Sequence, residues 1–296
     1  MYQSTIEAFL DSDAGRNLEG KVNLVFTSPP FPLGKPKKYG NLTGDEYLKW
    51  LSDLAPRLAK LLAEDGSIVI EIGNAWEPGE PTMSTLPLRA LLAMQESADL
   101  KLCQQFICHN PARLPTPTEW VNKQRIRVKD SYTHVWWMSR TARPKADNRE
   151  VLIEYSPSMK RLLNTQKYNS GERPSGHKIG ETSFLADNGG AIPASVLTYT
   201  NTSAATEYRD YCRAHGITPH PAQMQPELAE FFIKMLTKAE DIVFDPFGGS
   251  NTTGAVAESL GRQWVTVEAL EDYVQGSRGR FPSLAETESG VEDIAT

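Results

Sequence analysis

The stretch IVFDPFGGSNTTG, residues 242–254, decides the fold of this chain. Its first three residues form a short apolar run that predicts a buried β-strand. The glycine-rich turn that follows leads into a predicted helix over residues 252–260. Gly261 ends that helix, and residues 264–267 predict a second strand. A strand, a helix and a further strand in this order favour a parallel sheet of α/β type.

A second unit of the same kind lies near the start of the chain. Residues 22–26 predict a strand, residues 45–62 an amphipathic helix, and residues 67–72 another strand after a turn at residues 65–66. The other expected elements are a short helix within residues 1–20, helices over 86–94 and 226–236, and strands over 102–108 and 134–138. Trp136 and Trp137 are expected in the core.

The glycine-rich turn predicts a site for a nucleotide-type cofactor. Gly248 and Gly249 let a ligand approach the backbone closely, and the helix after them offers unpaired N–H groups. Glu268, at the end of the next strand, can accept hydrogen bonds from ribose hydroxyls. A purely structural turn is the alternative.

The details of the turn narrow the choice of cofactor. A phosphate-binding loop needs Lys after Gly254, where this chain has Ala255, and the dinucleotide pattern G-x-G-x-x-G is absent. Asp245 just before the turn would repel a diphosphate, but it suits a cationic or zwitterionic ligand. S-adenosylmethionine, with its ammonium and sulfonium groups, is such a ligand.

A second loop, Thr27-Ser28-Pro29-Pro30-Phe31, ends the first strand at the edge where open α/β sheets bind ligands. Proline lacks an N–H, so its carbonyl is free to accept a hydrogen bond from a ligand. The Ser28 hydroxyl adds an acceptor, and Phe31 adds a flat apolar face. This set suits a planar heterocycle with an exocyclic amine, whereas the alternative is a proline turn with a buried aromatic ring.

Together the two loops resemble those of the DNA amino-methyltransferases, which methylate cytosine N4 or adenine N6. The first loop resembles their catalytic [DNS]-P-P-[YF] motif and the second their D-P-F-x-G-S-G-T-T cofactor motif, with Asn251 where many members have Gly. The catalytic loop comes first by more than 200 residues, as in the circularly permuted beta group. Two further segments resemble the family: Lys-Asp-Ser-Tyr-Thr-His-Val-Trp-Trp over residues 129–137 and His-Pro-Ala-Gln over residues 220–223.

The resemblance implies a doubly wound, mostly parallel Rossmann-like methyltransferase sheet with an irregular target-recognition insertion. It implies S-adenosylmethionine as cofactor and double-stranded DNA as partner. The Ser in the first loop favours cytosine N4 as the target, with adenine N6 as the alternative. An RNA methyltransferase and an inactive DNA-binding relative are further alternatives. The residues expected to bind the cofactor are Asp245, Pro246, Phe247, Gly248, Gly249, Ser250, Thr252, Glu268, His220 and Pro221.

The residues expected to carry the reaction are Ser28, Pro29, Pro30, Phe31 and Glu71. The enzyme must flip the target base out of the duplex. Phe31 then stacks on the base, while the Ser28 hydroxyl and the Pro29 carbonyl hold the amine. Glu71 matches an acidic position in the cytosine-N4 members and could take the amine proton through Ser28. Alternatively, Glu71 only orders the loop.

The charge distribution supports a polyanionic partner although the net charge is −6. Residues 101–180 hold 15 basic and 6 acidic residues, whereas the rest of the chain holds 16 basic and 31 acidic residues. The alternative is a solvated basic surface. A basic strand over residues 123–129 and a flap over residues 32–44 are expected to contribute. The candidate DNA contacts are Lys35, Lys37, Lys38, Lys123, Arg125, Arg127, Lys129, Arg173, Ser175 and His177.

The composition is that of an ordinary globular protein, with 296 residues, 40% hydrophobic and 23% charged. Three cysteines indicate a reducing compartment, and their spacing to histidines predicts no metal site. We expect a cytoplasmic monomer that acts apart from any cognate restriction endonuclease. The expected division is a catalytic half over 1–138, a target-recognition region over 139–218, a cofactor half over 219–282 and a disordered tail over 283–296.

Overall fold

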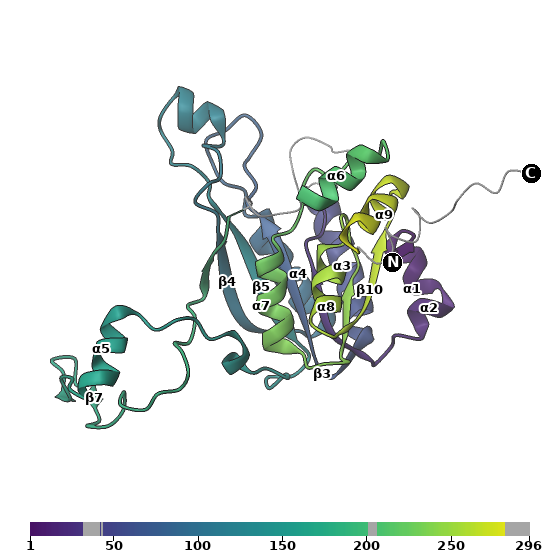
Figure 1. Ribbon diagram of the computed structural model, residues 1–296. Coiled ribbons are helices and arrows are strands. Elements are labelled where there is room, and N and C mark those ends of the chain that lie inside the picture. The colour runs from purple at the N-terminus through teal and green to yellow at the C-terminus, as the bar shows by residue number, and fades with distance from the viewer. Residues whose placement is uncertain (32–41, 43, 201–205, 282–296) are drawn as a thin grey trace, which may run out of the picture. The chain divides into compact units, whose positions relative to one another are not determined.

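The two predicted βαβ units form the middle of an eight-stranded sheet in the part of the chain that the structure describes (Figure 1). The strand order is β1-β10-β9-β2-β3-β5-β4-β8. The first five are mutually parallel, β5 is antiparallel to both neighbours, and β8 is parallel to β4. The strands are β1 (Tyr2–Gln3), β2 (Val22–Thr27), β3 (Leu62–Gly73), β4 (Lys101–His109), β5 (Tyr132–Ser139), β8 (Val196–Thr198), β9 (Ile242–Asp245) and β10 (Gln263–Glu268).

This computed structural model describes residues 1–31, 42, 44–200 and 206–281, and its chain divides into two compact units. The larger unit comprises Met1–Ala146 and the chain from Ser195 onward, and the smaller unit comprises Asp147–Ala194. The expected flap at 32–44 and the expected disordered tail lie largely or wholly outside the described residues. The boundaries expected for the target-recognition region stay a prediction.

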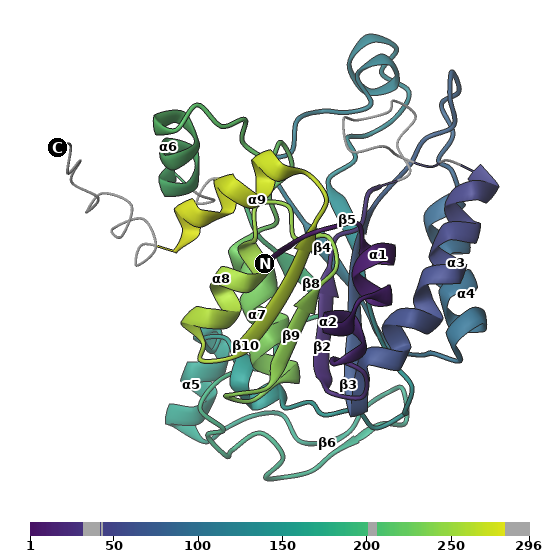
Figure 2. The ribbon, with the colours of Figure 1, turned by 90° about the vertical axis from the view of Figure 1, so that its right-hand side faces the viewer.

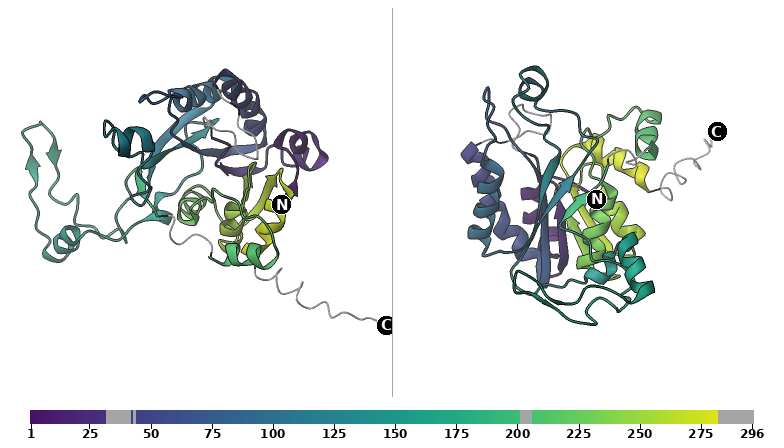
Figure 3. Two further views of the ribbon diagram at one scale, coloured as in Figure 1. Left: turned by 90° about the horizontal axis from the view of Figure 1, so that it is seen from above. Right: turned by 90° about the vertical axis from the view of Figure 1, so that its left-hand side faces the viewer.

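Helices cover both faces of the sheet in the larger unit (Figures 2 and 3). One face carries α1 (Ile6–Asp11), α2 (Asp13–Arg16), α3 (Gly44–Leu61) and α4 (Leu86–Ala98). The other face carries α7 (Pro226–Leu236) and α8 (Thr252–Ser259), while α6 (Thr206–Ala214) packs against α9 (Glu271–Ser277). In the described ranges, no helix is both long and apolar enough to cross a membrane. The expected doubly wound, mostly parallel α/β fold is confirmed.

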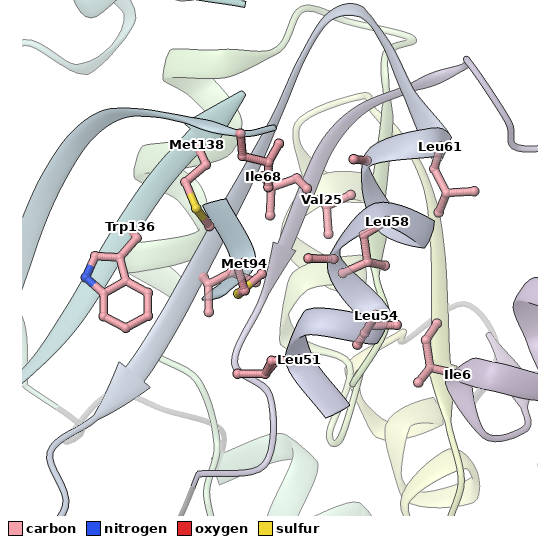
Figure 4. Packing of buried hydrophobic residues seen from close by; sticks show 14 of the residues in the cluster. Ile6, Val25, Leu51, Leu54, Leu58, Leu61, Ile68, Met94, Trp136 and Met138 are labelled. Carbon is pink, nitrogen blue, oxygen red and sulfur yellow. The ribbon is translucent and has the colours of Figure 1, made fainter. Parts of the chain in front are cut away.

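The apolar stripe of α3 builds most of the core on its side of the sheet (Figure 4). Leu51, Leu54 and Leu58 recur at helical spacing, and all three are almost fully buried. They pack with Val25 of β2 and Ile68 of β3 in one continuous cluster. This packing fixes the crossover from β2 to β3 and therefore the edge at which both strands end.

Most predicted elements lie where the sequence placed them, but two expectations are wrong. The turn expected at residues 65–66 is an irregular part of β3, where the pairing jumps from Val22–Leu62 to Leu24–Ser67. The strand expected over 123–129 is absent from these described residues. Glu119–Lys123 instead forms a π-helical turn, and Arg125 has a left-handed backbone with φ +58°, which breaks the alternation of a strand.

The smaller unit holds a 3₁₀ turn (Asn148–Val151), α5 (Pro157–Thr165) and a hairpin of β6 (Gly171–Glu172) and β7 (Lys178–Ile179). The hairpin turn is closed by two backbone hydrogen bonds. The Arg173 N–H donates to the His177 carbonyl oxygen, and the Gly176 N–H donates to the Arg173 carbonyl oxygen, each at 2.8 Å. Three candidate DNA contacts, Arg173, Ser175 and His177, therefore share one turn.

The strand order brings several chain segments to one edge of the sheet. The parallel strands β2, β3, β9 and β10 all end there, and antiparallel β5 begins there, because Gly73 pairs with Thr133. The chain leaves the central pair β2 and β9 toward opposite sides of the sheet. Such a switch point is where open α/β sheets bind ligands.

We expect Leu58→Ala to lower the free energy of unfolding by about 2–5 kcal/mol, because Leu58 is 1% exposed and its truncation leaves a cavity in the core. Urea unfolding followed by circular dichroism measures the change. Leu92→Ala on α4 is the matched control, since Leu92 is 56% exposed and should shift the value by less than about 0.5 kcal/mol. Equal effects of the two variants would contradict this account of the core.

Candidate active site at the carboxyl edge of the sheet

A cavity of about 800 Å³ lies at this edge, and both predicted loops line it. Every residue expected to act in catalysis or in cofactor binding contributes to its wall. From the first loop and β3 these are Ser28, Pro29, Pro30, Phe31 and Glu71; from the second loop and its surroundings they are His220, Pro221, Asp245, Pro246, Phe247, Gly248, Gly249, Ser250, Thr252 and Glu268. The fold thus joins segments more than 200 residues apart in sequence.

The Asp245 carboxylate connects the two loops. One oxygen accepts hydrogen bonds from the Thr27 hydroxyl at 2.6 Å and the Phe247 N–H at 3.0 Å. The other accepts from the Thr253 hydroxyl at 2.7 Å. Burial raises the pKa of Asp245 to about 6, against the opposing effect of these donors. The carboxylate is therefore ionised at neutral pH and tied to both ends of the cofactor turn.

The turn itself has the conformation that its glycine and asparagine allow. Gly249 and Asn251 have left-handed backbones, with φ +51° and +58°. The Glu268 carboxylate accepts hydrogen bonds from the Gly249 N–H and the Leu270 N–H, both at 2.9 Å. Burial raises the pKa of Glu268. Asn251 thus adopts a left-handed backbone, which asparagine accepts more readily than most residues other than glycine.

His220 packs over the cofactor turn. A Cβ atom added at Gly249 would lie 3.3 Å from the His220 imidazole. The imidazole also meets the Tyr273 ring edge-on, with 4.5 Å between the two ring centroids. The Ala222 N–H donates a hydrogen bond to the His220 Nδ1 atom at 3.3 Å. His220 thus forms a side wall of the cavity next to Gly249.

Arg280 is a residue that the sequence did not single out. Its Nε donates to the Ser250 carbonyl oxygen at 2.6 Å, and its Nη2 donates to the Ser250 hydroxyl at 2.9 Å and to the Gln223 Oε1 atom at 3.2 Å. The guanidinium also lies 4.9 Å from the Tyr208 ring centroid. Burial lowers its pKa to about 10, so it is still cationic at neutral pH. Arg280 therefore holds the back of the cofactor turn.

The catalytic loop faces the half-buried carboxylate of Glu71 on β3. Glu71 accepts a hydrogen bond from the Thr133 hydroxyl at 2.8 Å on its carboxylate, and the Ser28 hydroxyl donates to the Glu71 carbonyl oxygen at 3.5 Å. Burial raises the pKa of Glu71, and these hydroxyls together with the charge of Arg113 oppose the rise. A raised pKa makes a carboxylate a stronger base than an ordinary glutamate.

Gly73 makes room for the aromatic ring of the catalytic loop. A Cβ atom on Gly73 would lie 2.7 Å from two ring atoms of Phe31, closer than real contacts allow. The ring is therefore seated directly against the backbone at the end of β3. Gly73 belongs to the site although it offers no functional group.

Other wall residues come from segments outside the two predicted loops. The N-terminal residues Ser4–Glu7 reach the cavity because β1 pairs with β10 at the outer edge of the sheet. Cys108 and Asn110, at the end of β4, contribute with Arg113 and Thr133 to the wall near Glu71. Burial raises the pKa of the Cys108 thiol to about 12, so this thiol is neutral. The residues near Glu71 could have been predicted from the pairing of β5 with β3 and β4, because it brings the ends of these strands to one edge of the sheet.

Four of the candidate DNA contacts lie in residues 110–131, which we name the β4–β5 loop. In Figure 2 this loop rises above the upper ends of the strands. Lys123 pairs with Glu119 at 2.8 Å, Arg127 donates to the Pro81 carbonyl oxygen at 2.9 Å, and Lys129 donates to the Pro111 carbonyl oxygen at 2.7 Å. The side chain of Arg125 is exposed. Lys35, Lys37 and Lys38 lie outside the described residues.

Comparison with known proteins gives the family. The family model described as DNA methylase (N6_N4_Mtase) matches residues 22–278. The type II methyltransferase M.PvuII of Proteus hauseri is 44% identical over 275 residues, which cover 92% of this chain and 82% of that protein.

Solved structures agree. The structure named PvuII DNA methyltransferase (cytosine-N4-specific) matches with a TM-score of 0.75 and 35% identity, over all of this chain and 87% of that one. The M1.HpyAVI–SAM complex matches with a TM-score of 0.53 and 20% identity, over 94% of this chain and 97% of that one, and at this identity it shows the fold alone. The resemblance inferred from the two loops is thus confirmed, and the chain belongs to the N6/N4 DNA methylase family.

Proposed function

We propose that this chain transfers the methyl group of S-adenosylmethionine to the N4 amine of a cytosine in duplex DNA. The observation that carries the proposal is the single cavity whose wall contains both the Ser-Pro-Pro-Phe loop and the glycine turn. Its volume of about 800 Å³ lies in the range of small-molecule sites and leaves room for a base beside a nucleoside-sized cofactor. The cytosine-N4 specificity in the name of the PvuII enzyme supports the choice of base.

The residues at the glycine turn fit S-adenosylmethionine. Glu268 faces the cavity at the end of β10, where it can accept hydrogen bonds from the ribose hydroxyls. Asp245 lines the same cavity and would supply negative charge to the ammonium and sulfonium groups of the cofactor. The bound cofactor supplies an electrophilic methyl group on sulfur. Pro246, Phe247, Ser250, Thr252 and the His220–Pro221 segment would complete the walls of this half.

The catalytic loop receives and orients the base. A duplex base must be flipped out, at a cost of a few kcal/mol, because its amine is otherwise stacked inside the helix. The Phe31 ring stacks on the flipped base, and the Ser28 hydroxyl and Pro29 carbonyl accept hydrogen bonds from the two amine protons. Pro30 stiffens the loop. This arrangement aims the nitrogen lone pair at the methyl group, so positioning supplies most of the catalysis.

Glu71 removes the amine proton. The Ser28 hydroxyl lies beside Glu71 and lowers the pKa of its carboxyl group, so rotation of this hydroxyl from the Glu71 carbonyl oxygen to the carboxylate would place the carboxylate one hydrogen bond beyond the amine. When bound, S-adenosylmethionine would give up its methyl group and leave as neutral S-adenosylhomocysteine, so the new N–C bond replaces the broken S–C bond. The amine proton would pass to the Ser28 oxygen while the Ser28 proton would pass to Glu71. The positive charge on nitrogen is lost in the same step, and the methylated amine leaves neutral.

The basic side chains of the β4–β5 loop, the hairpin turn at Arg173–His177 and Lys35, Lys37 and Lys38 would contact the DNA. Phosphate contacts of this kind supply most of the affinity and lose strength with rising salt. We propose a cytoplasmic location, because the proposed DNA substrate lies inside the cell. We further propose that it acts as a monomer, apart from any restriction endonuclease.

The direct test is to incubate the protein with labelled S-adenosylmethionine and duplex DNA and to digest the DNA to nucleosides. We expect the label in N4-methylcytosine, which liquid chromatography with mass spectrometry identifies. Label in N6-methyladenine would overturn the choice of base, and label only with RNA would overturn the choice of polymer.

Ser28→Ala and Phe31→Ala should each lower the single-turnover rate of methylation by about 100-fold or more, because each removes a group that positions the amine. Neither residue belongs to the glycine turn, so the dissociation constant for S-adenosylmethionine, measured by isothermal titration calorimetry, should stay within about threefold. Full activity in both variants would contradict the proposed base pocket.

Glu71→Gln should lower the methyl-transfer rate by about 10²–10⁴-fold, as expected when a general base is lost. Because burial raises the pKa of Glu71, the wild-type rate should fall on acidification at a higher pH than an ordinary Glu would give. The variant should lose this pH dependence. If Glu71 only orders the loop, the variant instead keeps the wild-type pH profile, and that profile decides against the role as base.

Arg280→Met should weaken S-adenosylmethionine binding about tenfold or more, since it removes three charge-assisted hydrogen bonds behind the cofactor turn. Arg280→Lys should recover part of the affinity, because Lys keeps the charge but lacks the planar fork. The turnover rate at saturating cofactor should change less than KM. Arg213→Met, which removes only an exposed ion pair with Asp210, is the control and should bind like wild type.

A further inference from the structure

We propose that Arg113 donates a hydrogen bond to the C2 carbonyl oxygen of the flipped cytosine and thereby selects this base. The inference rests on the proposed function and adds a specificity-determining residue to it. Arg113 lines the same cavity as Ser28 and Glu71, although it comes from the β4–β5 loop and not from either motif. It is the basic residue that this loop contributes to the cavity wall in the described part of the chain.

The backbone of Arg113 is held in a fixed turn at the end of β4. The Arg113 N–H donates to the Asn110 carbonyl oxygen at 3.2 Å, and the Ala112 N–H donates to the Asn110 Oδ1 atom at 3.0 Å. The Asn110 N–H donates to the Ser131 carbonyl oxygen at 2.8 Å, which fastens this turn to the returning chain. The side chain therefore starts from a defined position at the cavity.

The guanidinium is anchored at one corner. Its Nη1 atom donates to the Tyr132 carbonyl oxygen at 3.0 Å and lies 3.9 Å from an Asp130 oxygen. Asp130 is fixed in turn by the Asn74 amide, at 2.8 Å. Nε and Nη2 have no hydrogen-bond partner among the described residues. An arginine held by one nitrogen presents its remaining N–H groups in a set direction, as the planar fork of this side chain allows.

The electrostatics place this cation on the target side of the cavity. The charge of Arg113 lowers the pKa of both Glu71 and Cys108, against the burial of those groups. Both belong to the wall beside the Ser28 loop and not to the glycine turn. Arg113 therefore lies on the same side of the cavity as the proposed base pocket, and the proposal sets its Nε and Nη2 atoms against the C2 edge of a base whose amine is held by Ser28 and Pro29.

The chemistry of the four bases makes this pairing selective. Only cytosine and adenine have an amine at the ring position that Ser28 and Pro29 would hold. Across the ring nitrogen from that amine, cytosine has the C2 carbonyl oxygen, whereas adenine has a C–H group. Adenine would leave a desolvated guanidinium N–H without an acceptor, and sites built around a hydrogen bond reject such analogues strongly. Thymine has the carbonyl but lacks the amine.

The test compares two duplexes that differ only at the target nucleotide of the sequence that the wild-type protein methylates. One has cytosine, and the other has the 2-aminopyridine C-nucleoside, which keeps the amine and the ring nitrogen but has C–H in place of the C2 carbonyl. Single-turnover methylation is measured for wild type and for Arg113→Met. We expect the substitution to slow methylation of cytosine about 10- to 100-fold and that of the analogue less than about threefold.

Equal losses on the two duplexes would overturn the assignment, because an arginine that contacts a phosphate or only braces Tyr132 cannot sense the missing carbonyl. Arg113→Lys keeps a cation beside Glu71 and should show a smaller loss with the same preference for the cytosine duplex. Arg89→Met, on α4 and paired with exposed Asp45, controls for loss of a surface charge and should act on both duplexes like wild type.

The outcomes for the two proposals can be told apart. Wild-type product identified as N6-methyladenine would overturn both the cytosine assignment and the role of Arg113. N4-methylcytosine as product, together with equal losses in Arg113→Met, would leave the proposed function standing and remove Arg113 alone. Unchanged affinity of Arg113→Met for S-adenosylmethionine is expected in either case, because the glycine turn is intact.

Discussion

The site depends on one buried carboxylate, that of Asp245. It lies at the switch point between β2 and β9, where the helices that follow these two strands cover opposite faces of the sheet. It accepts hydrogen bonds from Thr27 at the end of β2, from Phe247 in the glycine turn, and from Thr253 in the first turn of α8. Removing a carboxylate from water is costly, and the pKa of about 6 records that cost. Three donors offset it and hold the catalytic loop and the cofactor turn against each other. The residue that suggested a cationic ligand thus also holds the two halves of the cavity together.

The sequence predicted the parts of the fold that follow from local pattern. The leucine stripe of α3, the apolar strands β2 and β9 and the glycine turn each have the period or the breaker residue of their element. The site could be predicted from them, because carboxyl ends of parallel strands share one edge of a sheet. Two functional loops at such ends had to meet, and both line one cavity.

The rest could not be read from local pattern, because it depends on long-range packing. The order β3-β5-β4 brings Thr133 of β5 beside Glu71 of β3, but the sequences of these strands contain no pattern that predicts which strands pair. Arg280 follows an ordinary short helix, and its bonds to Ser250 span 30 positions. The basic residues at 123–129 alternate as in a strand, yet the Lys123–Glu119 pair and the left-handed Arg125 favour an irregular loop. Alternation of charge alone does not bury a face, so it cannot enforce a strand.

The β4–β5 loop joins the proposed DNA contacts to the target half of the cavity. Residues 110–131 hold five basic and two acidic side chains, whereas the smaller unit at 147–194 holds six of each, so the positive charge is concentrated in this loop. Hydrogen bonds join its two ends: Lys129 donates to the Pro111 carbonyl oxygen, and Arg113 donates to the carbonyl oxygen of Tyr132, which follows the loop. Phosphate contacts made farther along the loop would therefore be transmitted to a segment whose two ends are hydrogen-bonded together. The same end of the loop carries Arg113 and leads into Thr133, so the proposed phosphate contacts and the proposed pocket for the flipped nucleobase belong to one continuous segment.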